Sequence, residues 1–352
     1  MLKEMGMNAL RLEMTDHVCR MEYSVFGHSK LLEKVTGISV EEQRNGRGRE
    51  AFTAFTKAWD ICMHWSVRIG QGSLQPYVTS MGHAVYNEDG RDFNQNIHEL
   101  FFADEDEVFA FDPYETLPYL TEEEIIGQFN SHYKTECENA GDAVAMTGIY
   151  ISCMSGLIEM LGWNMLLTCA GADPKAFGEF TDRYSLWIER YFKALAKSDA
   201  PVVMIHDDIV WTEGAFISPE WYRRHIFPSY KRCFRHLHEA GKLIMFTSDG
   251  NYTEFIDDIA SCGVNSFVME PMTDMAYIAE KYGKTHSFVG NADTRILLHG
   301  SRDDIYREVK RCMDIGKKYP GFIMAVGNHI PANTPVDSCM WYNEFCRQLG
   351  KR

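Results

Sequence analysis

The chain has 352 residues, 45% of them hydrophobic, and its 50 Asp and Glu residues outnumber its 35 Lys and Arg residues to give a net charge of −15. This length accommodates one large α/β barrel or two ordinary domains, and the apolar content is high enough to fill a substantial core. An acidic chain in which no basic run interleaves with aromatic residues would repel a phosphate backbone, which argues against nucleic acid as a partner.

The first segment and the cysteines indicate a cytoplasmic protein. The stretch MLKEMGMNAL lacks the apolar core of a signal peptide, and the ten cysteines include no Cys-x-x-Cys pair, so we expect reduced thiols. No repeat of fixed period, low-complexity tract or Pro/Ser linker divides the sequence. We therefore expect a single domain over residues 1–352, with 1–140 as a helical N-terminal part and 141–352 as the main βα repeats.

One apolar stretch, Val144 to Gly171, is long enough to span a bilayer. It contains Glu159, Asn164 and several Gly and Ser residues, and neither end carries a Lys or Arg anchor. A buried strand followed by a buried helix fits this pattern better than a transmembrane span, so we expect no membrane association.

From about residue 173 onward the sequence alternates between helix and strand patterns. Asp173-Pro174 offers an N-cap and a first-turn proline to one helix, and Ser218-Pro219 offers the same to a second helix that runs to Gly241. Further helical patterns cover Asp274 to Tyr282 and Asp303 to Lys317. Five apolar strands alternate with these helices: PVVMIHDDI from Pro201, LIMFTSDGN from Leu243, GVNSFVMEP from Gly263, HSFVGNADT from His286 and GFIMAVGNHIP from Gly321. Repeated βα units of this kind predict a parallel sheet in which the five strands are neighbours.

Each of the five strands ends in polar residues. The ends are His206-Asp207-Asp208, Ser248-Asp249-Gly250-Asn251, Glu270-Pro271, Gly290-Asn291-Ala292-Asp293 and Gly327-Asn328-His329. Any one of them could be a solvated turn or a helix cap. In a (β/α)8 barrel, however, the carboxyl ends of all strands converge on the face where active sites are built. Five such ends in register indicate an active-site rim.

Several of these residues form a set that resembles the uroporphyrinogen decarboxylase superfamily. The resemblance rests on Asp207-Asp208, SPEWYRRHIFPSYKRCFRHLHEAGK, SDGN, GNADTRILLHGSRDDIYREV and GNHIPANTP in the C-terminal half, and more loosely on SMGHAVYNEDG from Ser80 to Gly90. It implies an α/β fold, a (β/α)8 TIM-type barrel with extra N-terminal helices. It also implies one of two chemistries: cofactor-free decarboxylation of a tetrapyrrole, or methyl transfer to or from a protein-bound corrinoid.

Departures from the family patterns bear on the choice between these chemistries. Thiol-methylating members hold zinc with a His-x-Cys and a distant Cys, whereas the matching positions here are Thr247, Asp249 and Asn328, so thiol methylation is not expected. Decarboxylase members have an N-terminal arginine loop that neutralises the substrate's carboxylates. Here Arg20 is followed at once by Glu22.

The acids left at the strand ends suit removal of a methyl group from oxygen. Crowded carboxylates raise one another's pKa, which can keep one protonated as a general acid, or they can share a divalent cation. When a cob(I)alamin nucleophile takes methyl from a methoxy group, the leaving oxygen must be protonated or metal-bound. The expected function is therefore corrinoid-dependent O-demethylation of a small methoxylated or methylated substrate. A cofactor-free decarboxylase and a non-catalytic ligand-binding barrel are the alternatives.

The candidate site residues follow from this hypothesis. The expected catalytic residues are Asp208, Asp249, Glu270 and His329, and the last three are also the expected ligands of a divalent metal such as zinc. The expected substrate-binding residues are Asp60, His83, Asp207, Asn251, Asn291, Asp293 and Asn328. Asp60 stands upstream of Met81-Gly82 in the order of the decarboxylase branch's catalytic aspartate, and a helix-surface carboxylate is the alternative for it.

Aromatic residues of the N-terminal part are candidates for a wall around the substrate. These are Tyr23, Phe26, Trp59 and Trp65, which stand near His28 and His64 in sequence, and core packing is the alternative fate for most of them. His17, His132 and His299 are expected to be surface or hydrogen-bonded residues. The expected partners are a small-molecule substrate and a small protein that carries the corrinoid, and we expect a monomer or a homodimer.

Overall fold

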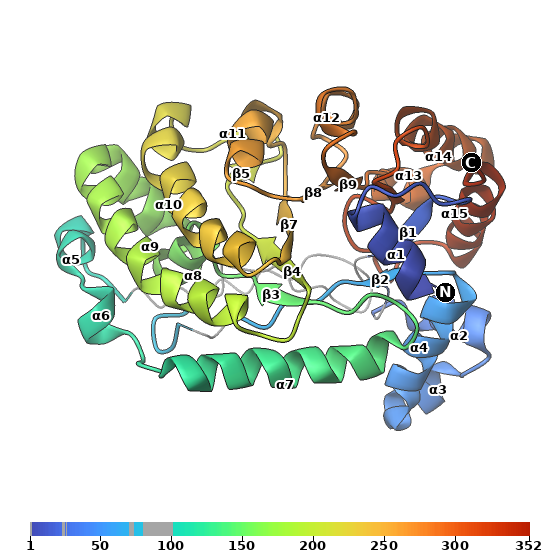
Figure 1. Cartoon of the computed structure of the whole chain (residues 1–352), viewed down its shortest axis with the longest axis horizontal. Coiled ribbons are helices and arrows are strands. Elements are labelled where there is room, and N and C mark those ends of the chain that lie inside the picture. Colours follow the sequence, from blue (N-terminus) through green and yellow to red (C-terminus); the bar gives the residue numbers. More distant parts are fainter. Residues whose placement is uncertain (1, 23–24, 26, 70–73, 80–100) are drawn as a thin grey trace.

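A parallel sheet of eight strands lies at the centre of the molecule, and helices surround it (Figure 1). The computed structural model describes residues 2–22, 25, 27–69, 74–79 and 101–352. In spatial order the strands are β2 (Met63–His64), β1 (Cys19–Glu22), β10 (Phe322–Met324), β9 (Ser287–Val289), β8 (Ser266–Met269), β7 (Leu243–Ser248), β4 (Val202–His206) and β3 (Thr147–Ile149). All pairings in this sheet are parallel. The predicted α/β class and the five neighbouring parallel strands are therefore confirmed.

The sheet curls until its two outer strands, β2 and β3, approach each other. Within the described residues no continuous ladder joins them, but two isolated parallel bridges do, Met63 to Val144 and Ile69 to Ile149. At the first bridge His64 N donates to Val144 O and Val144 N donates to Cys62 O, both over 2.8 Å. The strand order is that of a TIM-type barrel, with one seam held by isolated bridges. The predicted barrel is thus confirmed as a curled parallel sheet and not as a continuously closed one.

Separate apolar clusters fill the two sides of the sheet. On β4, Val202 and Met204 belong to the inner cluster, whereas Val203 and Ile205 belong to the outer core beneath the helices. This alternation follows from the two-residue period of a strand. The inner cluster also contains Cys19, Met21, Met245, Val268, Val289, Ile323 and Ala325.

Helix α1 (Leu2–Leu10) packs at the amino-terminal ends of the strands. Its residues Ala9 and Leu10 belong to the inner apolar cluster. At Gly6 the helix comes so close that an added Cβ would lie 2.7 Å from the carbonyl oxygen of Cys62, just before β2. The inner core is therefore covered by apolar residues at this end, while polar residues gather at the other.

The remaining helices cover the outer side of the sheet. They are α2 (Ser29–Thr36), α3 (Val40–Glu42), the π-helical η1 (Gln43–Arg47), α4 (Gly48–Ala58), α5 (Glu105–Ala110), α6 (Pro113–Thr116), α7 (Glu122–Ala140), α8 (Ser155–Ala172), α9 (Pro174–Ala196), α10 (Pro219–Glu239), the 3-10 helix η2 (Thr253–Phe255), α11 (Ile256–Ser261), α12 (Met275–Tyr282), α13 (Thr294–His299), α14 (Arg302–Gly316) and α15 (Val336–Leu349). Figure 1 shows α9 and α10 on the left, α11 and α12 above, α14 and α15 on the right and α7 below. A small hairpin of β5 (Val210–Trp211) and β6 (Gly214–Ala215) follows β4.

The predicted helix starts are confirmed. The Asp173 side chain accepts hydrogen bonds from the backbone N–H groups of Lys175 and Ala176 at the start of α9. The Ser218 side chain caps α10 and accepts from Trp221 N. Both helices place a proline in the first turn, where no intrahelical N–H partner is required.

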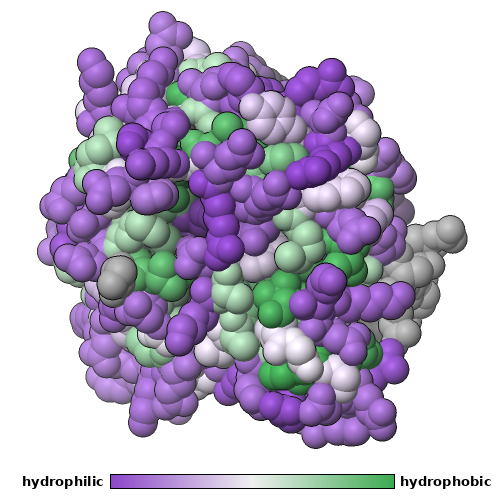
Figure 2. All heavy atoms as spheres, turned by 90° about the vertical axis from the view of Figure 1, so that its right-hand side faces the viewer, coloured by the Kyte–Doolittle hydropathy of each residue, from purple (hydrophilic) through white to green (hydrophobic). Residues whose placement is uncertain are grey.

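The apolar stretch from Val144 folds as predicted, into strand β3 and helix α8. Helix α8 is buried over its first two turns, from Ser155 to Gly162. None of the described helices is both long enough and apolar enough to cross a membrane. Figure 2 shows the side of the molecule that lies to the right in Figure 1, where hydrophilic side chains cover most of the surface and hydrophobic patches lie between them.

Candidate functional site

At the carboxyl end of β4, two polar residues face the inner side of the curled sheet and one faces the outer side. Because Val202 and Met204 face the inner cluster, the two-residue period carries His206 and Asp208 to the same side. Asp207 points the other way, towards the N-terminus of α8 and the hydroxyl of Tyr230 on α10. The neighbouring aspartates therefore have different surroundings.

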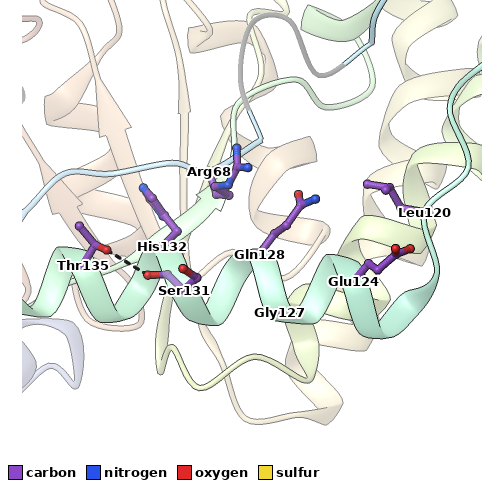
Figure 3. A pocket seen from close by; sticks show the side chains of 8 residues that line it. All are labelled: Arg68, Leu120, Glu124, Gly127, Gln128, Ser131, His132 and Thr135. Carbon is purple, nitrogen blue, oxygen red and sulfur yellow. Dashed lines mark hydrogen bonds between the residues drawn. The ribbon is translucent and has the colours of Figure 1, made fainter.

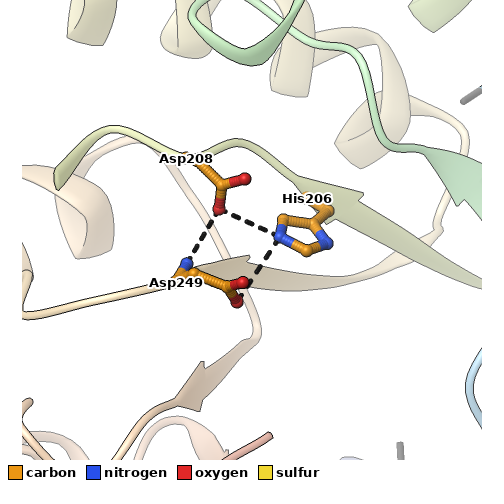
Figure 4. Close-up of side chains that lie close together, drawn as sticks. All are labelled: His206, Asp208 and Asp249. Atoms are coloured by element: carbon orange, nitrogen blue, oxygen red, sulfur yellow. Dashed lines mark hydrogen bonds and ion pairs between the residues drawn. The ribbon is translucent and has the colours of Figure 1, made fainter. Parts of the chain in front are cut away.

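His206, Asp208 and Asp249 form a compact group at the strand ends (Figure 4). His206 Nε2 lies 3.0 Å from Asp208 Oδ1 and 3.7 Å from Asp249 Oδ1. The backbone N–H of Asp249 donates to Asp208 Oδ1 over 2.9 Å. One ligand atom from each of the three residues lies within 4.8 Å of the others, an arrangement that can hold a metal ion. In the described part of the chain this is the one such group of three.

The electrostatics of the group favour added positive charge. Burial raises the pKa of Asp249 to about 7, and the neighbouring carboxylate of Asp208 contributes to the rise, although water reaches 52% of the Asp249 side chain. The His206 side chain is only 9% exposed, and burial alone would lower its pKa. Asp208 and Asp249 outweigh this effect, so the pKa of His206 is raised. A proton or a cation is therefore stabilised between these side chains.

Two aromatic rings pack against the imidazole of His206. The ring of Tyr150, which follows β3, lies edge-on with its centroid 4.3 Å away, and its hydroxyl donates to Asp208 Oδ2 over 3.2 Å. Trp65, which follows β2, meets the imidazole edge-on at 5.9 Å. Trp65 is thus at the site, as the predicted aromatic wall requires, whereas Trp59 is buried in the core against Phe55. The other two wall candidates, Tyr23 and Phe26, lie outside the described residues.

Glu270, Asn328 and His329 form a second group that ties strand ends together. The Glu270 carboxylate accepts from Gly250 N over 2.7 Å and from Asn328 Nδ2 over 2.6 Å. Asn328 Oδ1 accepts from His329 N over 2.7 Å and lies 2.9 Å from His329 Nδ1. Burial lowers the pKa of His329. The neutral imidazole is therefore favoured near pH 7.

The structure does not bring the expected metal set of Asp249, Glu270 and His329 together as one group of ligand atoms. Asp249 belongs to the group that can hold an ion, but its companions are His206 and Asp208. Both oxygens of Glu270 accept hydrogen bonds that hold the loops after β7 and β10. The negative charge of Glu270 still contributes to the raised pKa of Asp249. Its influence on the group is therefore electrostatic.

Asp207 has a structural position and not the substrate contact expected from the sequence. It is fully buried, and its carboxylate accepts from the backbone N–H groups of Cys153, Met154 and Ser155 and from the Tyr230 hydroxyl. Burial raises its pKa even though these donors oppose the change. A carboxylate bound to the N-terminus of a helix is stabilised by the unpaired N–H groups there. Asp207 therefore fixes α8 against β4.

Two residues of the N-terminal part lie away from the rim. Asp60 precedes β2, so it lies at the amino-terminal end of the parallel strands, where it pairs with Arg347 of α15 at 2.7 Å. Asp60 is therefore an exposed carboxylate at the end opposite to His206, Asp208 and Asp249, which matches the surface alternative expected for it. Arg20 is buried and pairs with Glu22 at 3.2 Å, as the sequence indicated. His83 lies outside the described residues.

The remaining predicted substrate ligands shape the loops at the rim. The Asn251 side chain accepts from Thr253 N over 3.1 Å. Asn291 is buried and donates to the carbonyl oxygens of Glu270 and Thr273. Asp293 caps α13 and pairs with Arg295 at 2.6 Å, and this pairing lowers the pKa of Asp293 against the opposing effect of burial. The described contacts of these three side chains are internal.

A separate pocket of about 520 Å³ lies along α7 (Figure 3). It is lined by Arg68, Leu120, Glu124, Gly127, Gln128, Ser131, His132 and Thr135. His132 is hydrogen-bonded to Thr147 Oγ1 at 2.8 Å and to Ser66 Oγ at 3.2 Å, as predicted for a satisfied histidine. None of the strand-end residues described above borders this pocket.

Two residues of the site, His206 and Tyr150, were not among those expected from the sequence. The sequence carried a signal for His206, because it stands two residues before Asp208 at the end of a strand, and residues two apart share a face. The same rule would have separated Asp207 from Asp208. Tyr150 had no such signal, because its place depends on the pairing of β3 with β4, which brings Ile149 beside Ile205.

Comparison with known proteins places this architecture in a family. Residues 110–349 match the family model described as Uroporphyrinogen decarboxylase (URO-D). A uroporphyrinogen decarboxylase from Carboxydothermus hydrogenoformans is 24% identical over 251 residues, which cover 70% of this chain and 68% of that protein. One from Geobacillus thermodenitrificans is 32% identical over 165 residues, 45% of this chain and 44% of that protein. A solved structure of a methyltransferase from Methanosarcina mazei has a TM-score of 0.66 and 16% identity, covering 99% of this chain and 98% of that one.

The family match covers most of the chain and contains β4 and β7 through β10 with their strand ends. The chain belongs to the uroporphyrinogen decarboxylase family. Other relatives with this name match over about half of their own length, 50% for the protein from Syntrophotalea carbinolica. The fold is shared with the Methanosarcina methyltransferase over nearly its whole length.

Proposed function

We propose that this chain is a corrinoid-dependent methyltransferase, which removes a methyl group from a small methoxylated or methylated substrate and passes it to a corrinoid carried by a partner protein. The main support for the proposal is the group of one histidine and two aspartates at the strand ends, His206, Asp208 and Asp249. The family includes enzymes named as decarboxylases, and the shared fold of the Methanosarcina protein, named as a methyltransferase, adds support.

The chemistry of demethylation explains why an acid group is suitable. The bond between the methyl carbon and the substrate oxygen breaks, and its electron pair stays on the oxygen. The reduced corrinoid supplies the nucleophile that takes up the methyl group. The oxygen needs a proton or a cation at that moment, and His206, Asp208 and Asp249 can provide either. The group has no cysteine, which suits methyl transfer from oxygen and not to a thiol.

Decarboxylation of a tetrapyrrole is the second candidate, favoured by the names of the relatives. Such a substrate carries many carboxylates and needs cationic side chains to bind it. Arg20 is buried and paired with Glu22, and the rim carries the carboxylates of Asp208, Asp249 and Glu270. Like charges close together repel, so these carboxylates weigh against a polyanion at this rim.

A direct assay separates the two functions. Purified protein is mixed with free cobalamin reduced to the Co(I) state and with a panel of methoxylated benzoates, and the Co(I) absorbance is followed. We expect a decrease that requires both protein and one class of methoxylated compound, and we expect Asp208→Asn to lower the rate at least about 100-fold. Asp257→Asn, which changes an exposed acid on α11, is the matched control and retains the wild-type rate.

The opposite result has an equally clear signature. Release of carbon dioxide from uroporphyrinogen without cobalamin, lost in Asp208→Asn and retained in Asp257→Asn, would contradict methyl transfer and establish the decarboxylase function.

A further inference from the structure

We propose that His206, Asp208 and Asp249 bind a divalent cation such as Zn²⁺ between the carboxyl ends of β4 and β7. This ligand set contains two residues of β4 and its following loop, and it differs from the set of Asp249, Glu270 and His329 that the sequence suggested. The inference deepens the proposed function, because the cation would meet the leaving oxygen, but cation binding can be measured without methyl transfer.

The ring nitrogen of His206 lies close to oxygens of two carboxylates. His206 Nε2 faces an oxygen of Asp208 at 3.0 Å and an oxygen of Asp249 at 3.7 Å. A ring nitrogen carries one hydrogen and can donate well to one of them, and 3.7 Å is too long for a hydrogen bond. A cation between the three atoms contacts all of them at once, because it attracts the nitrogen lone pair and both carboxylates.

The distances match those of a bound metal ion. A cation held at about 2.1 Å by each ligand separates neighbouring ligand atoms by about 3.4 Å in tetrahedral geometry and about 3.0 Å in octahedral geometry. Of the observed separations from His206 Nε2, 3.0 Å equals the octahedral value and 3.7 Å lies slightly above the tetrahedral one. Small rotations of the side chains therefore suffice for binding.

The surroundings hold the ligands in orientation and leave one side accessible. The Tyr150 hydroxyl donates to Asp208 Oδ2, and the Asp249 backbone N–H donates to Asp208 Oδ1, so the carboxylate plane is fixed. His206 and Asp208 are 9% and 19% exposed, whereas Asp249 is 52% exposed. The ligands thus face solvent on the side of Asp249, where a substrate oxygen could complete the coordination of the cation.

Charge balance and ligand chemistry indicate the kind of cation. Two carboxylates and one neutral imidazole carry a charge of about −2, which a divalent ion neutralises. One imidazole nitrogen and two carboxylate oxygens suit Zn²⁺ and its neighbours in the first transition row. Such an ion would act as a Lewis acid on the oxygen from which the methyl group departs.

The test measures binding directly. Protein dialysed against a chelator is loaded with Zn²⁺, desalted and analysed for metal, and a parallel titration with Co²⁺ is followed by visible absorption. We expect about one ion per wild-type chain. We expect Asp249→Asn to bind at least about 100-fold more weakly. Because Asp249 is half exposed, this variant should fold, and its circular dichroism spectrum and melting temperature are checked first.

Matched variants identify the ligands. Asp208→Asn and His206→Gln are expected to lose the ion as well, whereas His329→Gln is expected to keep one ion per chain, because its imidazole lies against Asn328 and outside the group. Loss in His329→Gln with retention in His206→Gln would overturn the proposed ligand set. Substoichiometric metal in the wild type, or full binding in folded Asp249→Asn, would overturn the site itself.

Binding and activity distinguish this inference from the proposed function. One tightly bound ion in a protein that consumes no Co(I) cobalamin with any methoxylated compound supports the site and contradicts methyl transfer. Methyl transfer that continues at full rate in chelator-treated, metal-free protein supports the function and overturns the cation site.

Discussion

Asp207 and Asp208, which follow β4, are adjacent in sequence but have different roles in the structure. Asp207 is buried among four hydrogen-bond donors at the N-terminus of α8, while Asp208 faces the inner side with His206 and Asp249. Both carry the same side chain, so the difference comes from the direction that the strand gives them. Substitution of each should therefore affect a different property.

We predict that Asp207→Asn lowers the free energy of unfolding by about 2–3 kcal/mol, because the amide NH₂ cannot accept from the buried N–H groups of α8. Asp208→Asn should cost at most about 1 kcal/mol, since its amide oxygen can still accept from Asp249 N. Urea unfolding of both variants measures the difference. Equal losses in the two variants would show that Asp207 has no special structural role.

At the scale of elements, a buried ion pair connects strands with the C-terminal helix. Arg20 of β1 pairs with Glu22 and donates to Trp59 O and to Asn343 Oδ1 on α15. Glu22 also accepts from the Tyr342 hydroxyl and from Val326 N, just after β10. These contacts bring together parts of the chain that are more than 300 residues apart in sequence.

We expect Glu22→Gln to lower the free energy of unfolding by about 3–5 kcal/mol, because the guanidinium of Arg20 is left buried without a counter-charge. The exposed pair of Arg47 and Glu50 is the matched control, and Glu50→Gln should leave the free energy of unfolding nearly unchanged because water already solvates both groups. Denaturant unfolding compares the two variants. A loss in Glu22→Gln as small as in the control would show that the buried pair contributes little.

The start of α14 provides a prediction about pH. The Ser301 side chain and backbone N–H, together with Arg307, lower the pKa of Asp304 to about 2. A carboxylate whose pKa is lowered on folding stabilises the protein above its unfolded pKa, and this contribution is lost as the pH falls through the folded value. The melting temperature of Asp304→Asn should therefore lie below that of the wild type at pH 7, and the difference should disappear towards pH 2.

Measurement of both proteins from pH 7 to pH 2 tests this expectation. A difference that stays constant down to pH 2 would mean that the ionised carboxylate of Asp304 is not its source. Ser301→Ala removes one donor from the same capping box and should show a smaller difference over the same pH range.

The helices and strands that the sequence predicted correctly are those whose sequence patterns lie within a few residues of one another. The caps at Asp173 and Ser218 and the strands that end at His206 and Ser248 are each encoded within a few residues, and the structure confirms them. Strands β2 and β3 contain two and three residues, too few for a period to show, and they form only because they pair with distant segments. Sequence patterns therefore could not predict the seam of the curled sheet, which these two strands form.

The candidate site was predictable to the same extent. Asp208 and Asp249 stand at strand ends that the sequence revealed, and the structure brings them together. The position of Asp60 was not predictable in this way, because β2 has only two residues and leaves no strand pattern in the sequence. Asp60 lies at the amino-terminal end of the strands because it precedes β2. Glu270 was placed correctly at a strand end, but its bonds to Gly250 and Asn328 depend on three loops meeting.

At the scale of the whole molecule, the two ends of the strands have opposite character. Apolar residues of α1 cover the amino-terminal end of the inner core, and the polar groups of the candidate site lie at the carboxyl-terminal end. The inner cluster is rich in methionine, a flexible side chain that fills irregular space. The position of α1 then depends on how closely its backbone can approach the strands.

At Gly6 the backbone of α1 lies close to the strands, and substitution of this residue tests whether α1 stabilises the whole curled sheet. A Cβ at this position would lie 2.7 Å from Cys62 O and 2.8 Å from Val144 Cγ2, on the two segments that form the seam between β2 and β3. We expect Gly6→Ala to lower the free energy of unfolding by about 1–3 kcal/mol, because either the helix or the seam must move. In Gly171→Ala, where nothing lies within 4 Å of the added Cβ, the change should stay within about 1 kcal/mol and favour stability. Urea unfolding monitored by tryptophan fluorescence compares the two, and a Gly6→Ala variant as stable as Gly171→Ala would show that α1 does not pack tightly on the seam.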